Sequence, residues 1–474
     1  MQTYSTAFCI TAPSSGEGKT TLAMGLMRLL SRTHKVQAFK CGPDYVDTSY
    51  HAIASKNTSY NLDTWLMGEK EVINTFTKYH TQAEISIIEG VMGFFDGKKY
   101  EENIFSLPSY LHSTQEKNNL PNIEGSTAHI AKLLQLPVIM VINAKGMAQS
   151  ISAIVRGFYE QAQEYSINLV GIIANNIGSE RHYQILQESL TAWNLPPLLG
   201  YVPKNIHFKA KERQLGLNHI FQTNEELEEQ LDLLADILEK HIDITKLLSL
   251  THYQNTLKSY TIQKKQTQNK KIGIAYDEAF CFYYPENLHY LENNGYELYY
   301  FSPLKDKKLP NVHAIYLGGG YPEIYADLLS KNTQMRQAIF NFAENNGYIF
   351  AECGGYMYLC SKLITTNEQS LDHKNLEQAH SNIYPMCNVI KATAIMRNRL
   401  HSLGYKQGYF CNTPFFLDKK ITYFRGHEFH WSNIKLEQDY TPFLTINNQQ
   451  IGIIYKNVFA SYMHFYFANS SICE

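Results

Sequence analysis

The stretch Thr11–Thr21, with the sequence TAPSSGEGKTT, holds the residues with the clearest chemical potential in this chain. It follows the apolar run Ala7–Ile10 and precedes the helix-forming run Leu22–Leu30, so the pattern predicts a strand, a tight loop and a helix. Pro13 stands where the usual phosphate-binding loop has its first glycine, which makes this a variant of that motif. The alternative is a glycine-rich turn that only caps a helix, but the flanking strand and helix favour a phosphate loop.

Five residues of this loop are suited to a nucleotide. Gly16 and Gly18 allow the backbone N–H groups to converge on an anion at the helix N-terminus. Lys19 can then neutralise phosphate charge, and the hydroxyl of Thr20 can reach a Mg²⁺ ion. We assign Thr21, the next residue, to the same site. The first domain is therefore expected to bind ATP with Mg²⁺.

A second group of candidates follows the apolar run Val36–Lys40. The stretch Lys40–His51 is expected to be a loop and carries two carboxylates, Asp44 and Asp47. Open α/β sheets bind ligands in loops at the carboxyl ends of their parallel strands. The two side chains can hold Mg²⁺ or orient a reacting carboxylate. The alternative is an Asx-turn with a helix cap.

A third group comes after the apolar run Ile85–Glu89, which leads into the glycine-rich segment Gly90–Gly97. An acid at the end of such a strand, opposite a phosphate loop, is the usual place for a Mg²⁺ or water contact in nucleotide hydrolases. Glu89 and Asp96 are therefore candidates. The alternative is a buried glutamate with a structural role only.

The rest of the first half repeats one pattern. Near-continuous apolar runs at Pro137–Asn143, Leu169–Asn175 and Pro197–Pro203 alternate with stretches of helical character. Such runs are typical of a parallel sheet that helices cover on both faces. We assign Asn175, at the end of one run, to the nucleotide site.

The second half of the chain restarts this alternation and leads to a cysteine. The apolar run Tyr348–Glu352 ends at Cys353, and two glycines and a helical run follow. A sharp turn of this kind exposes the thiol at a helix N-terminus, where the dipole favours the thiolate. The N–H after the cysteine and another from Gly318–Gly320 can form an oxyanion hole. We therefore assign Gly319 and Gly320 to substrate positioning.

A thiol nucleophile needs a proton acceptor, and three histidines in the C-terminal part are candidates. His464 lies at the end of a predicted apolar strand, while His427 and His430 share the segment Arg425–His430. A single histidine is more often structural than catalytic. Chemistry alone therefore divides the choice evenly between His464 and its competitors.

The composition argues against several classes of protein. The chain has 474 residues, of which 44% are hydrophobic, which suggests about two to three domains. Its 42 basic and 44 acidic residues give a net charge of −2, so nothing points to nucleic acid or an anionic membrane. The N-terminus has no basic region and no run reaches ~18 apolar residues, so we expect a soluble cytoplasmic protein. The eight cysteines lack paired spacing, which disfavours a disulfide framework or a zinc site.

A change in composition near the middle suggests the domain organisation. The stretch Asn224–Glu239 has helical apolar spacing with an acidic outer face. The stretch Thr251–Lys271 is polar, basic and without periodicity, which predicts a solvated linker. We therefore expect an ATP- and substrate-binding domain at 1–222, a helix and linker at 223–270, and a second domain at 271–474.

Taken in order, these motifs resemble those of the cobyrinic acid a,c-diamide synthases, relatives of dethiobiotin synthetase with a class I type glutamine amidotransferase domain fused behind. The resemblance covers essentially the whole chain. It rests on the phosphate loop, the segments starting at Lys40 and Glu89, and three further motifs: Gly125–Ala128, Asn143–Ser150 and Gly178–His182. It implies an α/β fold with two doubly wound parallel-sheet domains, P-loop NTPase-like and then flavodoxin-like.

The resemblance also implies which residues act in the second domain. It favours His464, within the family pattern Ala-Ser-Tyr-x-His, as the partner of Cys353. Many relatives outside the cobalamin group have a glutamate two residues after this histidine. Here that residue is Tyr466, so we expect a Cys–His dyad that releases ammonia from glutamine.

In the first domain the resemblance implies that ATP phosphorylates a substrate carboxylate and that ammonia then displaces the phosphate. Four acids match family motifs and are expected to position metal or substrate: Asp44, Asp47, Glu89 and Asp96. The expected Mg²⁺ ligands are Thr20, Asp47 and Glu89. The implied substrate is cobyrinic acid, amidated at its a and c acetate side chains in cobalamin synthesis.

The chain departs from the family pattern at an insertion and at three positions. Residues 98–124 are polar and turn-rich where the family has a short connection, and we interpret them as a surface insertion able to overhang the substrate cleft. Asn143 stands where the family often has an acid, and Asn176 where it often has arginine. Gln214 lies where Glu-Arg-His is usual. These differences bear on Mg²⁺ and nucleotide binding more than on the reaction.

Three other functions fit parts of the same sequence. Members of the same family amidate nickel sirohydrochlorin or hydrogenobyrinic acid, and sequence alone separates these substrates poorly. Cobyric acid synthase has a similar plan, but the motifs at Lys40 and Glu89 fit the diamide enzyme better. A partitioning-type switch ATPase carries a lysine early in the loop, where this chain has Ser14. We expect no nucleic-acid or membrane partner and leave a homodimer open.

Overall fold

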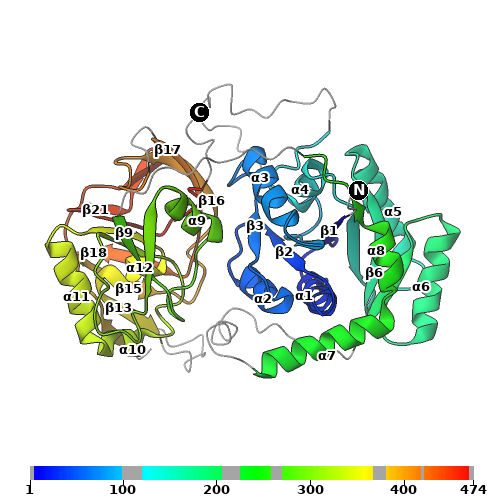
Figure 1. The fold of residues 1–474 in the computed structure, drawn as a ribbon, viewed down its shortest axis with the longest axis horizontal. Helices are drawn as coiled ribbons and strands as arrows, with labels where there is room; N and C mark the ends of the chain where they lie inside the picture. Colours follow the sequence, from blue (N-terminus) through cyan, green and yellow to red (C-terminus); the bar gives the residue numbers. More distant parts are fainter. Residues whose placement is uncertain are drawn as a thin grey trace, which may run out of the picture. The chain divides into compact units, whose positions relative to one another are not determined.

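The computed structural model describes six stretches of the chain: residues 5–98, 120–204, 225–257, 270–366, 381–417 and 421–468. The chain divides into two units, Met1–Thr261 and Ile262–Glu474, which we call the first and second units (Figure 1). Most of the expected insertion, Gln214 and most of the expected linker lie outside the described residues. The ends of the insertion meet, since the amide of Lys98 donates to the carbonyl oxygen of Glu124 at 2.8 Å.

The first unit is built on a parallel sheet. Its seven parallel strands are β1 (Ser5–Thr11), β2 (Val36–Cys41), β3 (Tyr60–Leu62), β4 (Ile85–Glu89), β5 (Val138–Asn143), β6 (Leu169–Ile177) and β7 (Leu198–Pro203). They lie in the order β3-β2-β4-β1-β5-β6-β7. Every residue of β2 and β4 is buried, as expected for apolar strands covered on both faces. The strand order places β1, which leads into the phosphate loop, in the middle of the sheet, where ligands bind in such folds.

Helices cover both faces of this sheet. They are α1 (Lys19–Leu30), α2 (Val46–Ser55), α3 (Glu69–His80), α4 (Thr127–Leu133), α5 (Ile151–Glu164), α6 (Glu180–Ala192), α7 (Glu225–His241) and α8 (Ile244–Leu250). Helices α1, α2 and α7 contact one another and share one hydrophobic core with the sheet. Because crossovers between parallel strands are right-handed, the strand order puts α3 to α6 on the opposite face. The expected loop Lys40–His51 is wrong in its second half, because α2 begins at Val46.

Helix α7 packs on α1 through an apolar stripe, and both are labelled in Figure 1. The buried residues of α7 are Leu227, Leu231, Leu234, Ala235 and Leu238. A side chain at Gly25 of α1 would collide with Leu234 and Leu238, so this glycine permits the close approach of the two helices. The chain then forms β8 (His252–Tyr253), which pairs antiparallel with β1, and Tyr253 is buried. The polar linker therefore starts later than the predicted Thr251.

The second unit has a central sheet with the order β10-β9-β11-β12-β22-β21. Its strands are β9 (Lys270–Ala275), β10 (Tyr296–Phe301), β11 (Ala314–Leu317), β12 (Tyr348–Glu352), β21 (Ile453–Tyr455) and β22 (Val458–Ser461). All neighbours are parallel except β21 and β22. The helices are α9 (Pro285–Asn293), α10 (Ala326–Lys331), α11 (Thr333–Glu344) and α12 (Gly354–Leu359).

Two smaller sheets, which the sequence did not predict, belong to the same unit. One contains β13 (Cys360–Thr366), β14 (Ser381–Pro385), β15 (Ile390–Met396) and β18 (Ser432–Leu436). The other contains β16 (Ser402–Phe410), β17 (Tyr423–His430), β19 (Leu444–Ile446), β20 (Gln449–Ile451) and β23 (His464–Phe465), and its strands are antiparallel. Each small sheet shares a hydrophobic core with the central sheet. The core of the first small sheet also includes residues of α10 and α11, and the core of the second is rich in aromatic residues.

The expected fold class, α/β with two parallel sheets wound by helices, is confirmed. In both units the candidate functional residues lie at or just after the carboxyl ends of parallel strands, namely β1, β2, β4 and β6 in the first unit and β11, β12 and β22 in the second. Within the described stretches, every helix is too short or too polar to cross a lipid bilayer.

The packing of α7 leads to a stability prediction. Leu231 is fully buried against the core, whereas Leu233 on the same helix is 61% exposed. Replacing Leu231 by Ala leaves a cavity and should lower the free energy of unfolding of the first unit by about 2–5 kcal/mol. Urea denaturation followed by tryptophan fluorescence measures this change. The matched variant Leu233→Ala should change it by about 0.5 kcal/mol or less, and equal effects of the two changes would contradict the packing.

Candidate functional site

The phosphate loop has the backbone that its glycines predict. Gly16 and Gly18 have φ angles of 83° and 101°, in the left-handed region that favours glycine. Helix α1 begins at Lys19, directly after the loop. The ammonium of Lys19 lies over the loop and donates to the carbonyl oxygens of Ser14 at 3.0 Å and Met92 at 2.5 Å. The loop therefore offers helix N-terminal amides and a cation for phosphate oxygens, and Thr21 lies in the first turn of that helix.

Asn175 lies beneath this loop. Its Nδ2 donates to the carbonyl oxygen of Glu17 at 2.7 Å, and a side chain at Gly18 would collide with it. The Glu17 carboxylate in turn accepts from the amide of Asn143 at 2.6 Å. The ends of β5 and β6 thus fix the shape of the phosphate loop. The amide of Asn175 touches the loop backbone, and its contact with a nucleotide stays a prediction.

A buried carboxylate, Glu89, lies at the centre of the site. It accepts from the Thr20 hydroxyl at 2.5 Å and from the Lys40 ammonium at 2.9 Å, and Nε2 of His51 lies 2.5 Å from its second oxygen. Glu89 is 0% exposed. Burial alone disfavours the charged form, but Lys40 and His51 outweigh it and lower the pKa of Glu89. Glu89 is therefore a carboxylate at neutral pH.

Lys40 bridges two of the predicted acids. Its Nζ lies 2.6 Å from Asp47 and 2.9 Å from Glu89. Burial by itself lowers the pKa of Lys40, but these carboxylates together with Asp44 raise it above its usual value. The ammonium therefore stays charged and links Asp47 to Glu89. The structure thus brings the three predicted Mg²⁺ ligands Thr20, Asp47 and Glu89 together. Thr20 contacts Glu89 directly, whereas Asp47 is linked to Glu89 by the ammonium of Lys40.

The donor set fits a Mg²⁺ ion held mainly by phosphate oxygens. The described residues contain no cluster of three or more His, Cys, Asp or Glu side chains arranged to hold a metal. Mg²⁺ in nucleotide sites usually takes one or two protein ligands together with phosphate oxygens and waters. The hydroxyl of Thr20 and the carboxylate of Glu89, 2.5 Å apart, supply such a pair. Asp47 is less suited, because its carboxylate pairs with the Lys40 ammonium.

The other two acids have local hydrogen bonds. Oδ1 of Asp44 accepts from the amides of Val46 and Asp47, which is the helix-capping arrangement considered as the alternative. Asp96 accepts from the amide of Gly93 at 2.7 Å and lies close enough to Lys19 to favour its charged form. Both residues lie beside the site, and their roles toward a substrate stay predictions.

In the second unit Cys353 lies in a strained turn. Its φ of 45° is rare for a residue with a side chain, and it links β12 to α12. The amide of Cys353 donates to the carbonyl oxygen of Ser461 at 2.8 Å, which joins the turn to the end of β22. Burial, followed by the nearby Glu323, raises the pKa of the Cys353 thiol. The turn therefore does not expose the thiol as expected, since Cys353 is buried, and this burial opposes the thiolate that the dipole of α12 favours.

The loop Gly318–Gly320 lies against His464 and against the two glycines that follow Cys353. A side chain at Gly319 would collide with the imidazole of His464. A side chain at Gly354, the residue after Cys353, would come within 3.1 Å of the amide nitrogen of Gly320. The structure thus gathers Cys353, His464 and the two predicted glycines in one place. The backbones of the two segments lie close together, and the oxyanion hole expected from their amides stays a prediction.

His464 begins strand β23, a small correction to its expected place at a strand end. It is buried, and its ring stacks on His427 with centroids 4.9 Å apart. Burial, with the nearby His427 and His430, lowers the pKa of His464. The imidazole is therefore neutral and can accept a proton. Burial thus disfavours charge on both Cys353 and His464 in the free protein.

The two competing histidines have other contacts. Nε2 of His427 lies 2.7 Å from the hydroxyl of Tyr284, and burial lowers the pKa of His427 to about 3. Nδ1 of His430 lies 2.7 Å from the carbonyl oxygen of Ser432, and its ring stacks on Tyr462. These contacts give both residues structural roles and favour His464 as the proton acceptor.

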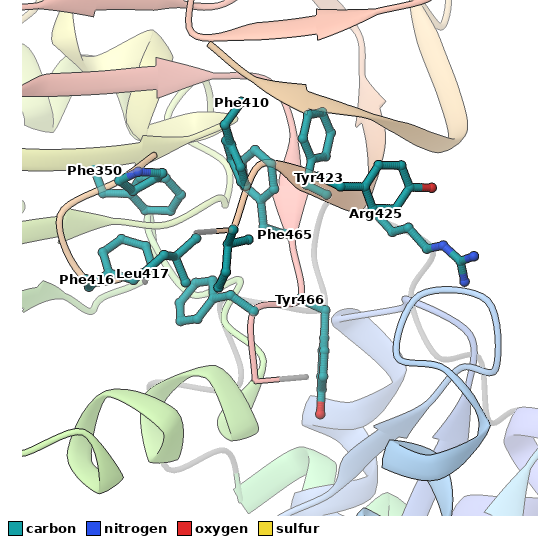
Figure 2. Close-up of a pocket in the computed structure, with 12 residues that line it drawn as sticks. Phe350, Phe410, Phe416, Leu417, Tyr423, Arg425, Phe465 and Tyr466 are labelled. Carbon is teal, nitrogen blue, oxygen red and sulfur yellow. The ribbon is translucent and has the colours of Figure 1, made fainter. Parts of the chain in front are cut away.

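Aromatic rings support the strand of His464. Figure 2 shows Phe350, Phe410 and Phe465 grouped around a small pocket, with the guanidinium of Arg425 pointing away from the rings. Successive side chains of a strand face opposite ways, so Phe465 anchors β23 in this core while His464 faces the other side. Tyr466, two residues after His464, is also buried, and it occupies the position where the sequence analysis noted a glutamate in many relatives. The pocket is part of the core behind the site.

The sequence analysis missed three buried residues of these sites. Lys40 and His51 flank the predicted acids Asp44 and Asp47, and a lysine at the end of a predicted buried strand was the signal for a buried ion pair. Glu352 directly precedes Cys353 and was taken as the end of a strand. The structure shows it buried with hydrogen bonds on both oxygens.

Removing the buried ammonium of Lys40 tests the charge cluster. Lys40→Met should lower the free energy of unfolding by about 3–5 kcal/mol, because Glu89 and Asp47 lose their compensating charge. Denaturation midpoints measure the loss, and Lys35→Met, an exposed lysine just before β2, is the control. Adding Glu89→Gln should recover part of the loss. Additive effects of the two changes would show that the pair is not coupled.

The burial of Cys353 predicts a pH dependence of its alkylation. Only the thiolate reacts with iodoacetamide, and an ordinary thiol has a pKa of about 8.5. Because burial raises the pKa of Cys353, labelling in the absence of glutamine should be slow at neutral pH and should increase only above the ordinary value. Peptide mass spectrometry can compare it with the exposed Cys411 in the same sample. Fast labelling of Cys353 below pH 7 would contradict a buried neutral thiol.

Comparisons with known proteins identify both units. Residues 8–217 match the family described as "CobQ/CobB/MinD/ParA nucleotide binding domain", and residues 271–472 match "CobB/CobQ-like glutamine amidotransferase domain". The expected enzyme class, a glutamine-hydrolysing ligase with a nucleotide-binding unit, is confirmed. A solved PurLQS structure from Thermotoga maritima is 17% identical and covers 41% of this chain and 86% of its own, with a TM-score of 0.28.

Two curated relatives match along almost the whole chain. The cobyrinate a,c-diamide synthase of Caldanaerobacter subterraneus subsp. tengcongensis is 36% identical over 96% of this chain and 94% of its own. The protein of the same name from Picrophilus torridus is 36% identical over 97% of this chain and 95% of its own. The chain therefore belongs to the cobyrinate a,c-diamide synthase family.

Proposed function

We propose that this protein uses ATP and glutamine to convert the a and c acetate carboxylates of cobyrinic acid into amides, through acyl-phosphate intermediates. The observation that carries the proposal is the presence of two distinct constellations on one chain. One is the phosphate loop with the Lys40–Glu89 cluster, and the other is the buried Cys353–His464 dyad. The relatives' names supply the substrate.

The second unit supplies ammonia. The sulfur of Cys353 attacks the side-chain amide carbon of glutamine, and His464 takes the thiol proton as the C–S bond forms. His464 then passes that proton to the leaving nitrogen, so ammonia departs and a glutamyl thioester remains. Water cleaves the thioester to glutamate and restores the thiol. Because thiol and imidazole start neutral, proton transfer accompanies the attack, and the amides after Cys353 and in Gly318–Gly320 hold the oxyanion.

The first unit activates the carboxylate. Backbone amides of the phosphate loop and the Lys19 ammonium bind the phosphates of ATP, and a carboxylate oxygen of the substrate displaces ADP from the γ-phosphorus. Thr20 and Glu89 would hold Mg²⁺, which supplies charge neutralisation for the transferred phosphoryl group. Lys40 keeps Glu89 and Asp47 in place. Ammonia then attacks the acyl carbon, and phosphate leaves with its bonding electrons.

Chemistry requires this activation, because a free carboxylate is a poor electrophile toward ammonia. The buried positive charge of Lys40 beside Lys19 suits a site where phosphate and carboxylate meet. The relatives' names favour cobyrinic acid over nickel sirohydrochlorin and hydrogenobyrinic acid. Glutamine and ATP are the other proposed substrates.

Variants of the two sites should separate the two half-reactions. With cobyrinic acid, MgATP and glutamine, mass spectrometry should show two successive replacements of OH by NH₂, accompanied by ADP release. Cys353→Ala should abolish this amidation with glutamine and preserve it with free ammonia, because only the nucleophile is lost. Lys19→Ala should abolish it with either nitrogen source. Cys411→Ala, at an exposed cysteine, should behave as the unaltered protein.

Two outcomes would change the proposal in different ways. Amidation of nickel sirohydrochlorin or hydrogenobyrinic acid, with cobyrinic acid left unchanged, would keep the chemistry and replace the substrate. ATP turnover that is indifferent to every tetrapyrrole would reject the ligase proposal for this protein.

A further inference from the structure

The strand that carries His464 has little backbone pairing of its own. β23 consists of His464 and Phe465, which pair with His427 and Gly426 of β17. Because the strand is so short, it makes few hydrogen bonds to β17. Its position therefore depends on contacts with side chains of other elements. Asn287 of α9 supplies one anchor, since its Nδ2 donates to the carbonyl oxygen of Phe465 at 2.7 Å.

Glu352 supplies the other anchor, from the strand of the nucleophile. It is the last residue of β12, directly before Cys353, and is 1% exposed. Its Oε1 accepts from the amide of Phe465 at 2.9 Å, and its Oε2 lies 2.7 Å from the hydroxyl of Tyr316 on β11. One carboxyl group therefore connects the residue before the nucleophile with the residue after the proton acceptor.

We propose that Glu352 is a positioning residue for glutamine hydrolysis, which fixes His464 relative to Cys353 through the backbone amide of Phe465. This inference rests on the proposed function of the Cys353–His464 dyad. The related enzymes mentioned above have a glutamate two residues after the histidine, and this chain has Tyr466 at that position. Here an acid at the end of β12, in the central sheet, holds the strand of the histidine, and Tyr316 orients that acid.

Burial and hydrogen bonding act in opposite directions on the carboxyl group of Glu352. Burial raises the pKa of Glu352 to about 8, although the hydrogen bonds from Tyr316 and Phe465 act to lower it. The two carboxyl oxygens accept from the backbone amide of Phe465 and from the Tyr316 hydroxyl. A glutamine side chain can accept from the Phe465 amide with its carbonyl oxygen and donate to the Tyr316 oxygen with its NH₂ group, in nearly the same shape. An acid that acted by its charge would instead lose its function in a Gln variant.

The experiment measures glutamine hydrolysis by the full-length protein in the presence of MgATP and cobyrinic acid. Glu352→Ala should lower kcat by about 100-fold with little change in KM, because a displacement of about 1 Å costs that much in rate. Glu352→Gln should restore kcat to near that of the unaltered protein. Tyr316→Phe, which removes only a hydroxyl, should give an intermediate kcat and keeps the test valid if Glu352→Ala folds poorly.

Controls separate positioning from folding and from the proposed function. Ammonia-dependent amidation should be the same in all three variants, because the first unit is untouched. Glu297→Ala, an exposed glutamate on β10 of the same sheet, should leave kcat unchanged. An unchanged kcat in Glu352→Ala, or a Glu352→Gln variant as slow as Glu352→Ala, would overturn the positioning role. Glutamine hydrolysis that survives Cys353→Ala would instead reject the proposed dyad.

Discussion

The burial of the Glu89 carboxylate constrains most of the first unit. A charge without exposure to water is tolerated only where partners compensate it, and here they come from three different elements: Thr20 of α1, Lys40 of β2 and His51 of α2. The order of the sheet places β2 and β4 side by side, so the ammonium and the carboxylate meet at the ends of neighbouring strands. The phosphate loop, the strand ends and α2 are thereby held in one arrangement before any phosphate binds.

The two sites solve opposite electrostatic problems with the same architecture. The proposed phosphoryl transfer concentrates negative charge, and the first unit provides two ammonium groups, Lys19 and Lys40, near the carboxyl ends of its strands. In the second unit, burial raises the pKa of the Cys353 thiol and lowers that of His464, so it disfavours charge on both groups. Parallel strands provide both settings because their carboxyl ends gather loops and helix N-termini.

Much of the fold could be predicted because its parallel strands are buried on both faces. The runs at Ile85–Glu89 and Tyr348–Glu352 became strands with the expected bounds, since apolar stretches of this length leave little ambiguity. The two small sheets were missed because strands such as β16 carry mixed polar and apolar residues, which give no clear strand pattern. Helix α2 was missed because Asp44 was considered mainly as a ligand, although it also caps a helix.

Site residues could be predicted where the chemistry requires a particular residue type. They were harder to predict where the role of a residue depends on its place in the fold. A phosphate loop needs glycines and lysine, and a nucleophile elbow needs cysteine and glycines, so both leave patterns in the chain. Glu352 differs, because its partner is the backbone amide of Phe465, 113 positions later, and any residue there except proline has that amide. Such an anchor leaves a trace only at the acid itself, which in the sequence looks like the polar end of an apolar strand. The order of the strands gives that acid its meaning, since β22 and the following β23 bring the C-terminal segment beside β12.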